Sequence, residues 1–227
     1  MYGQLLQHKV RSKLTYCDTK TLSPSTTVDR VIFRLRSIND PQWVFGGHQP
    51  AFHDKWANLY DNYRVTYIKW YITATPNREL FTQQVASTGT ATGAFHGVSD
   101  SNHGDMLHNP AILFWEVADS STAERTQSTD LNIIRENPND ERVAYKMTTS
   151  NPFKNYKLSG KASVKALVND PTAYATVTAF NNNIGAGEKY LHIGVMSKDG
   201  GVASSYKFDI TIQYFCEFTG ITVEEQN

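Results

Sequence analysis

Hydrophobic and polar residues alternate along most of this chain with a period of two, the pattern of half-buried β-strands. The clearest case is Ser205–Phe218, where every second residue from Tyr206 is apolar and the residues between them, except Phe215, are polar. Loops rich in Gly, Asn, Ser and Pro separate eight such segments. The predicted strands are Lys9–Cys17, Val28–Ile38, Tyr63–Thr75, Ile112–Val117, Arg142–Thr148, Tyr156–Val168, Tyr190–Met196 and Ser205–Phe218.

Two short segments show helical spacing instead. Pro50 suits the first turn of a helix, and Ala51–Asp61 is predicted as that helix. Apolar residues then recur at helical spacing and extend just past its end: Phe52, Trp56, Leu59, Tyr60 and Tyr63. The second predicted helix is Thr129–Glu136, which Asn137-Pro138 ends. Helices this short need a sheet to pack against.

These elements predict an all-β fold. A chain of 227 residues with 40% hydrophobic content can bury one sizeable core, so we expect one domain over residues 1–227. Eight strands with long connections favour two packed antiparallel sheets, and the eight-stranded jelly roll is the expected arrangement.

Charge changes this picture locally rather than overall. The chain has 22 basic and 22 acidic residues and a formal net charge of zero, so on average it is not a polyanion binder. Through Arg36, however, seven basic residues stand against two acidic ones. We therefore expect one side of the surface to be basic.

One motif goes beyond fold class. It runs from Gly46 to Thr75, and its characteristic positions are Gly47, His48, Gln49, Pro50, Phe52, Asp54, Trp56, Tyr60, Tyr63, Arg64 and Val65. The order resembles the G-H-Q-P…F-D-x-W…Y-x-x-Y-R-V signature of capsid proteins from circovirus-like, Rep-encoding single-stranded DNA viruses, with His53 inserted in the Phe-Asp step. Leu131–Thr149, Tyr190–Val195 and the last strand are similar in style to the same family.

The resemblance implies a single jelly roll whose copies, sixty in the simplest case, assemble into an icosahedral shell around a circular single-stranded DNA genome. It also implies residence in the virion after synthesis in a host cell, nuclear passage, and a host receptor that the sequence does not identify. The family carries an Arg-rich arm before its first strand, whereas residues 1–7 here read MYGQLLQ.

Two predicted strands carry rows of basic residues. Alternation places Lys9, Arg11 and Lys13 on one side of the first strand, and Arg30, Arg34 and Arg36 on one side of the second. In a shell, such rows would contact the phosphates of the genome without reading its sequence. An ordinary solvated sheet face is the alternative. The aromatics nearest to these charges are Tyr2, Tyr16 and Trp43. They are candidates to stack unpaired bases, but core or interface packing is favoured for each.

Contacts between copies are expected from aromatic residues near the loops, namely Trp43, Phe45, Phe81 and Phe95. The loops at Gln83–Asn109 and Asn169–Lys189 are expected to face outward. In a jelly roll the first and last strands pair antiparallel, which separates Cys17 from Cys216 and predicts two free thiols.

No catalytic motif is present, so no enzyme activity and no cofactor are expected. His96, Asp100, His103, Asp105 and His108 are suitable metal ligands, but a solvent-facing loop is favoured for them and no metal site is predicted. No apolar run approaches membrane-spanning length, so no membrane insertion is expected. The alternatives to a shell subunit are a jelly-roll carbohydrate-binding module with aromatic anchors, and a metal enzyme on a similar β fold.

Overall fold

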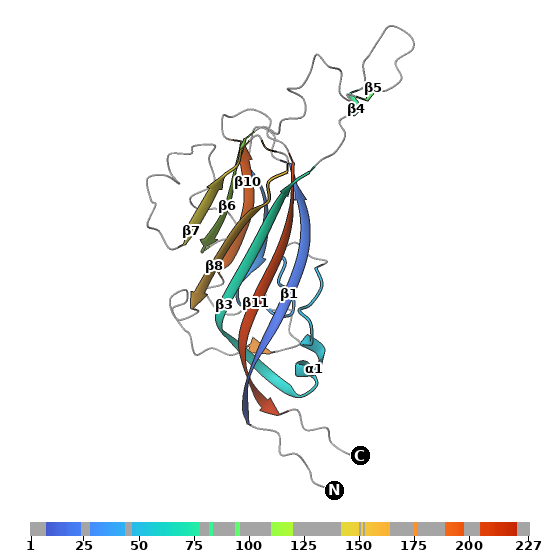
Figure 1. Cartoon of the computed structure of the whole chain (residues 1–227). Coiled ribbons are helices and arrows are strands. Elements are labelled where there is room, and N and C mark those ends of the chain that lie inside the picture. The colour runs from blue at the N-terminus through green and yellow to red at the C-terminus, as the bar shows by residue number, and fades with distance from the viewer. Residues whose placement is uncertain are drawn as a thin grey trace.

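The computed structural model describes residues 8–23, 28–43, 47–77, 82–83, 94–95, 110–119, 142–149, 151, 153–163, 175–176, 189–197 and 205–221. Two antiparallel sheets lie face to face (Figure 1). The first contains, in spatial order, β1 (Lys9–Leu22), β11 (Tyr206–Ile221), β3 (Tyr60–Pro76) and β8 (Tyr156–Ser163), with β9 (Ala175–Thr176) paired to one end of β3. The second contains β2 (Asp29–Arg34), β10 (Tyr190–Ser197), β6 (Ala111–Ala118) and β7 (Val143–Met147). A separate short pair joins β4 (Thr82–Gln83) to β5 (Ala94–Phe95).

This strand order is that of a jelly roll, which confirms the predicted fold class. All eight predicted strands are present, with different ends. β1 runs on to Leu22 because β11 pairs with it as far as Tyr206. β2 stops at Arg34 rather than Ile38, because the Arg34 amide turns back to donate to the Pro41 carbonyl. That residues 1–227 form one domain stays a prediction.

The predicted helix Ala51–Asp61 is shorter in the structure. α1 covers only His53–Ala57. The chain enters it through Phe52, which has a left-handed backbone (φ 69°), and Tyr60 already pairs with Ile221 of β11. The helix therefore ends at Ala57, because from Tyr60 onward the chain is paired with β11 in the sheet. Thr129–Glu136 lies outside the described residues.

Aromatic residues nevertheless anchor α1 to the first sheet. Trp56 stacks on Phe218 of β11, with ring centroids 4.9 Å apart. Tyr60 and Tyr63 are buried beside Phe218, but they reach it from β3 and not from the helix. The Phe52 ring is 64% exposed, and Lys55 Nζ lies 5.0 Å from its centroid.

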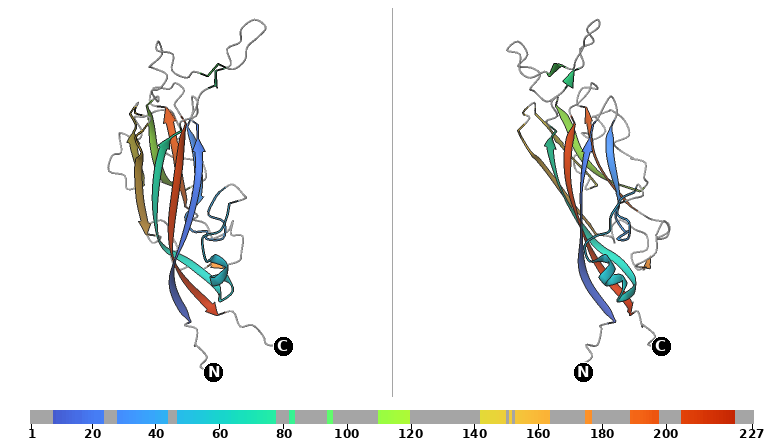
Figure 2. Two further views of the ribbon diagram at one scale, coloured as in Figure 1. Left: turned by 45° about the vertical axis from the view of Figure 1, so that its right-hand side comes forward. Right: turned by 90° about the vertical axis from the view of Figure 1, so that its right-hand side faces the viewer.

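The core fills the space between the two sheets. Trp70 of β3 and Trp115 of β6 meet edge to face, with centroids 4.9 Å apart, and so join the sheets at their middle. The Trp115 indole N–H donates to the Ser159 carbonyl of β8 at 3.2 Å. Aromatic pairs of this kind add about 0.5–1.5 kcal/mol beyond the area they bury. The two layers are visible in Figure 2.

Buried tyrosine hydroxyls make further links between the two layers. Tyr214 of β11 donates to the Arg34 carbonyl at 3.0 Å, and Tyr63 of β3 donates to the Arg36 carbonyl at 3.1 Å. At the opposite end, Tyr206 donates to the Thr148 hydroxyl at 2.9 Å. Burial raises the pKa of Tyr206, which keeps its hydroxyl protonated as a donor.

Both cysteines are free thiols, as predicted. Cys17 pairs with Thr211 in the register of β1 and β11, while Cys216 pairs with Ser12 further along. Burial raises the pKa of the Cys216 thiol, whereas Cys17 is exposed. Among the residues described, no helix is long and apolar enough to cross a membrane.

Gly160 of β8 should not tolerate a side chain. A Cβ atom there would overlap the Trp70 ring, which occupies the space above the glycine. We expect Gly160→Ala to lower the free energy of unfolding by about 1–3 kcal/mol, the usual cost of overpacking. Denaturant unfolding followed by tryptophan fluorescence measures this. Ser159→Ala, at the exposed neighbouring position, is the control and should change stability by less than about 0.5 kcal/mol. Equal effects of the two changes would contradict this account of the core.

Candidate nucleic-acid interface

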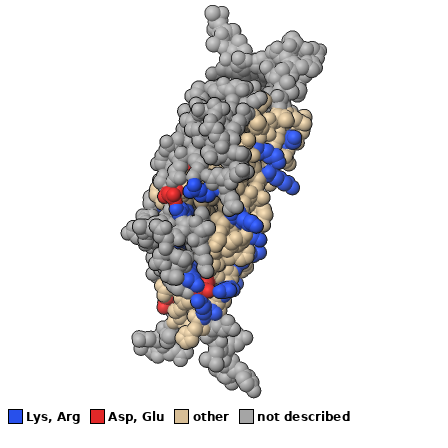
Figure 3. Space-filling model, turned by 90° about the vertical axis from the view of Figure 1, so that its left-hand side faces the viewer, with Lys and Arg blue, Asp and Glu red and all other residues tan. Residues whose placement is uncertain are grey.

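The face of the first sheet that points away from the second sheet is strongly basic. Directly paired residues share a face, so the strand registers place eight cationic residues together. We call them the basic sheet face: Lys9, Arg11, Lys13, Arg64, Lys69, Lys157, Lys161 and Lys207. The same registers add only two acidic residues, Asp209 and Glu217. Figure 3 shows Lys and Arg side chains in a row along one edge of the molecule.

Glu217 organises one end of this face. Its side chain is completely buried, and its carboxylate accepts from Lys9 Nζ at 2.9 Å, Arg64 Nη2 at 2.7 Å and Arg11 Nε at 3.3 Å. The three cations come from β1 and β3, on either side of β11, so the cluster fastens three strands together. One carboxylate cannot neutralise three cations. The Arg11 side chain is 82% exposed and can contact a further anion.

Aromatic side chains lie among the cations. The rings of Tyr67 and Phe215 are 5.5 Å apart, and Lys69 Nζ lies 5.6 Å from the first centroid and 5.8 Å from the second. Tyr71, two residues further along β3, is 47% exposed. Cations and aromatic rings on one surface are the combination with which proteins bind single-stranded nucleic acid.

A β-bulge puts these side chains on the outer face. The pairing shifts between Phe215 and Cys216, so that Phe215 faces Tyr67 and Cys216 faces Val65. Thr66 is the extra residue, and its hydroxyl donates to the Phe215 carbonyl at 2.9 Å. Simple alternation along Tyr63–Thr75 puts Val65 on the same side as Tyr67, which is wrong, because the bulge turns Val65 into the core.

The structure divides the six predicted genome-contacting residues between two sheets. Lys9, Arg11 and Lys13 belong to the basic sheet face. Arg30, Arg34 and Arg36 lie in or just after β2, in the second sheet. Arg34 and Arg36 are only 3% and 6% exposed, so the prediction that they form a solvent-facing basic row is wrong.

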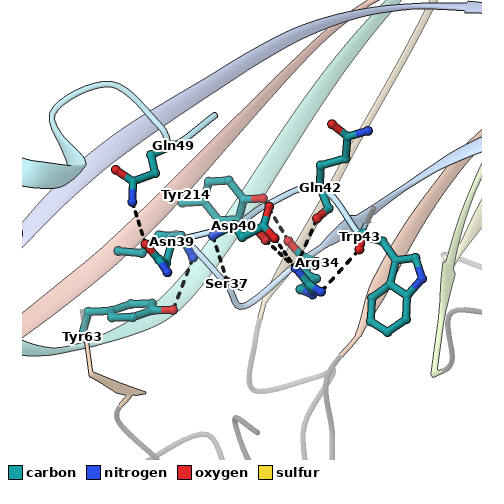
Figure 4. A network of polar contacts seen from close by, with 10 residues as sticks. Arg34, Ser37, Asn39, Asp40, Gln42, Trp43, Gln49, Tyr63 and Tyr214 are labelled. Atoms are coloured by element: carbon teal, nitrogen blue, oxygen red, sulfur yellow. Dashed lines mark hydrogen bonds and ion pairs between the residues drawn. The ribbon is translucent and has the colours of Figure 1, made fainter. Parts of the chain in front are cut away.

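The Arg34 side chain is buried because its guanidinium donates hydrogen bonds to the turn that follows β2 (Figure 4). Its Nη1 donates to the Asp40 carboxylate and the Asp40 carbonyl, both at 3.0 Å, and to the Gln42 carbonyl at 3.2 Å. Its Nη2 donates to the Trp43 carbonyl at 3.4 Å, and its guanidinium lies 4.8 Å from the Trp43 ring centroid. The planar fork of an arginine suits several acceptors at once. Arg34 is therefore a structural residue.

Residues of the Gly47–Pro50 motif contact the turn after β2 and the neighbouring strand β1. Gln49 donates to the Asn39 side chain at 2.6 Å, and His48 stacks on Tyr16 of β1 with centroids 4.5 Å apart. Burial raises the pKa of Tyr16, and the nearby Asp18, which accepts its hydroxyl hydrogen bond, raises it further. A Cβ atom on Gly47 would come within 2.9 Å of the Gln42 side chain. Pro50 is buried, and its carbonyl accepts from the His53 amide.

The predicted contacts between copies fall mostly outside what the structure describes. The ring of Trp43 packs within its own chain, against Arg34 and at 5.0 Å from the Tyr190 centroid. Phe45 and Phe81 lie outside the described residues, and of Phe95 only the backbone, in β5, is described. The loop with His96, His103 and His108 is also outside them. Elsewhere, within the described ranges, no three metal-ligating side chains come together.

Of the eight cations of the basic sheet face, five were not predicted from the sequence as part of a basic surface: Arg64, Lys69, Lys157, Lys161 and Lys207. Lys157, Lys161 and Lys207 are spread over two strands, and no local pattern joins β8 to β3. Lys69 was recoverable in part, since it alternates with the apolar residues of its strand. Arg64 was predicted for a structural role in the motif, and its ion pair with Glu217 links that motif to the basic sheet face.

The chain matches no protein-family profile and no curated protein sequence. Its fold is similar to several solved virus structures. One is Desmodium yellow mottle tymovirus, at 12% identity and a TM-score of 0.40 over 96% of this chain and 93% of that one. The semi-empty virus-like particle of Macrobrachium rosenbergii nodavirus has 8% identity and a TM-score of 0.46 over 96% and 97%. The 60-mer of the BFDV capsid protein has 12% identity and a TM-score of 0.41 over 96% and 97%. These values are low, so the assignment of the jelly roll depends on the strand order of this chain itself.

The two groups of cations should behave differently when removed. We expect Arg34→Met to lower the free energy of unfolding by about 3–5 kcal/mol, because it leaves Asp40 buried without its partner. The double change Lys13→Met plus Lys161→Met, at two exposed positions outside the Glu217 cluster, should alter stability little, but should weaken binding to a polyanion such as oligo(dT) and reduce the salt dependence of that binding. Urea unfolding and fluorescence anisotropy of labelled oligonucleotide provide the two readouts. The distinction fails if Arg34→Met leaves stability unchanged.

Proposed function

We propose that this chain is a viral capsid subunit that self-assembles into an icosahedral shell around a circular single-stranded DNA genome. The observation that carries the proposal is the concentration of charge on one face. Eight cations against two acidic residues lie on one side of a jelly roll whose formal net charge is zero. A shell subunit needs such asymmetry, because only its inner side contacts phosphates.

The motif resemblance supports the same function from independent residues. The G-H-Q-P segment, Trp56 and Arg64 match the circovirus-like signature, and here they pack against β1 and β11 or contact Glu217. The shell would place the basic sheet face inward. Lys9, Arg11 and Lys13 would then contact the genome backbone. Passage through the nucleus is a further expectation from the resemblance.

Assembly into a closed shell would bury apolar surface between copies. Within the described residues, the aromatic side chains with the greatest exposed fraction are those of Phe153, at 70%, and Phe52, at 64%. Phe52 also holds a backbone conformation that costs a non-glycine residue about 1–2 kcal/mol. An exposed aromatic kept at such a cost is a good candidate for a contact between subunits.

Purified protein should form particles. Sixty copies of the 25.6 kDa chain give a mass of about 1.5 MDa, so size-exclusion chromatography should elute it near the void volume and negative-stain microscopy should show round shells. A protein that stays monomeric at high concentration in all buffers tried would contradict the proposal and favour the carbohydrate-binding alternative.

Phe52→Gly separates assembly from folding. Glycine adopts the φ of this position without strain, so the subunit should be as stable as the wild type or more stable. Loss of the aromatic ring should nevertheless reduce particle yield if Phe52 contacts another copy. Thermal unfolding and microscopy measure the two effects. Tyr145→Ala, which removes a less exposed aromatic from β7, is the control. Normal particles from Phe52→Gly would exclude this residue from the subunit contact.

A further inference from the structure

We propose that the basic sheet face binds unpaired nucleic acid by stacking a base on Tyr71, with the neighbouring lysines of β8 holding the phosphates. This deepens the proposed function, on which it rests only for the inward orientation of the face. It adds to that function the residue that selects an unpaired strand over a duplex.

The side chains directly opposite Tyr71 on the two neighbouring strands leave its ring partly uncovered. Tyr71 pairs with Thr211 of β11 on one side and with Ser159 of β8 on the other, and both side chains are short. Its ring is therefore left 47% exposed in the middle of a sheet. Tyr67 differs, because its ring packs on Phe215 and lies beneath the Lys69 ammonium. No ring or cation contact covers Tyr71 within the described part of the chain.

Two lysines of β8 flank this ring. Lys157 and Lys161 lie two residues to either side of Ser159, whereas the Lys69 ammonium lies over the rings of Tyr67 and Phe215. Diagonal neighbours in a sheet are about 7–8 Å apart, which long side chains span. Lys157 and Lys161 are exposed. A base on Tyr71 would therefore have the ammonium groups of Lys157 and Lys161 on its β8 side to contact the adjoining phosphates.

Exposed aromatic rings favour a single strand over other polyanions. In a duplex the faces of the bases are already stacked on one another, so Tyr71 has nothing to contact. A sulfated polysaccharide would use the lysines but has no planar base for the ring. Only an unpaired polynucleotide uses both features.

Two matched variants test the stacking. Tyr71→Phe keeps the ring and removes the hydroxyl, whereas Tyr71→Ala removes the ring. Anisotropy of labelled oligo(dT) should show about 10-fold weaker binding for Tyr71→Ala, and nearly wild-type binding for Tyr71→Phe. The slope of log affinity against log salt should be unchanged in both. Lys157→Met plus Lys161→Met should instead make that slope shallower by about 1.4, as expected for two fewer phosphate contacts on a single strand.

The same titrations with duplex DNA and with heparin complete the test. Both should bind more weakly than oligo(dT), and Tyr71→Ala should not affect them. Equal binding of oligo(dT) by wild type and Tyr71→Ala overturns the inference, and so does an equal loss for heparin, which would indicate a general polyanion surface.

Microscopy of the same preparations keeps this inference separate from the proposed shell. Binding is measured on full-length protein diluted until size exclusion shows free subunits. Ring-dependent binding without particles at any concentration would retain the stacking site and reject the shell. Particles whose binding of oligo(dT) does not depend on the Tyr71 ring would retain the shell and reject the stacking site.

Discussion

The structure depends on the strict alternation of β11. This strand is paired along its length on both sides, with β1 and with β3. Its inward residues, from Tyr206 to Phe218, form the middle of the core, and its outward residues lie at the centre of the basic sheet face. Because side chains in a strand point alternately to opposite sides, a one-residue shift would exchange core and surface along the whole strand. The core and the candidate interface are therefore two sides of one pattern.

Two features modify that pattern near Glu217 of β11: a β-bulge in β3 and a cluster of ion pairs. The bulge at Thr66 changes which residues of β3 face outward, so that Tyr67, Lys69 and Tyr71 lie on the outer side of the sheet with the cations while Val65 joins the core. Glu217 then holds Lys9, Arg11 and Arg64 across the seams between three strands. A buried carboxylate with three cationic partners also prevents the crowded cations from repelling one another apart.

The fold could be predicted from the sequence because alternation is a local property. All eight strands were found, and the jelly roll followed from their number and the length of their connections. The site was less accessible. Arg34 and Lys13 look alike in an alternating segment, yet the first is buried by Asp40 and by carbonyls after β2, and the second is exposed. Such partners depend on how the chain turns after a strand, which alternation does not encode. The joining of Lys157 and Lys161 to Tyr71 likewise depends on pairing between distant strands.

The charge of the basic sheet face sets a limit on what it can hold. If sixty copies form the proposed shell, an excess of six positive charges on each would balance about 360 phosphates. Encoding the 227 residues of this chain alone takes roughly 680 nucleotides, each with one phosphate. The sheet face could thus neutralise only part of an enclosed genome. Small cations from the medium, or other polypeptide, would have to balance the remainder, and the osmotic pressure of those ions would act outward on the shell.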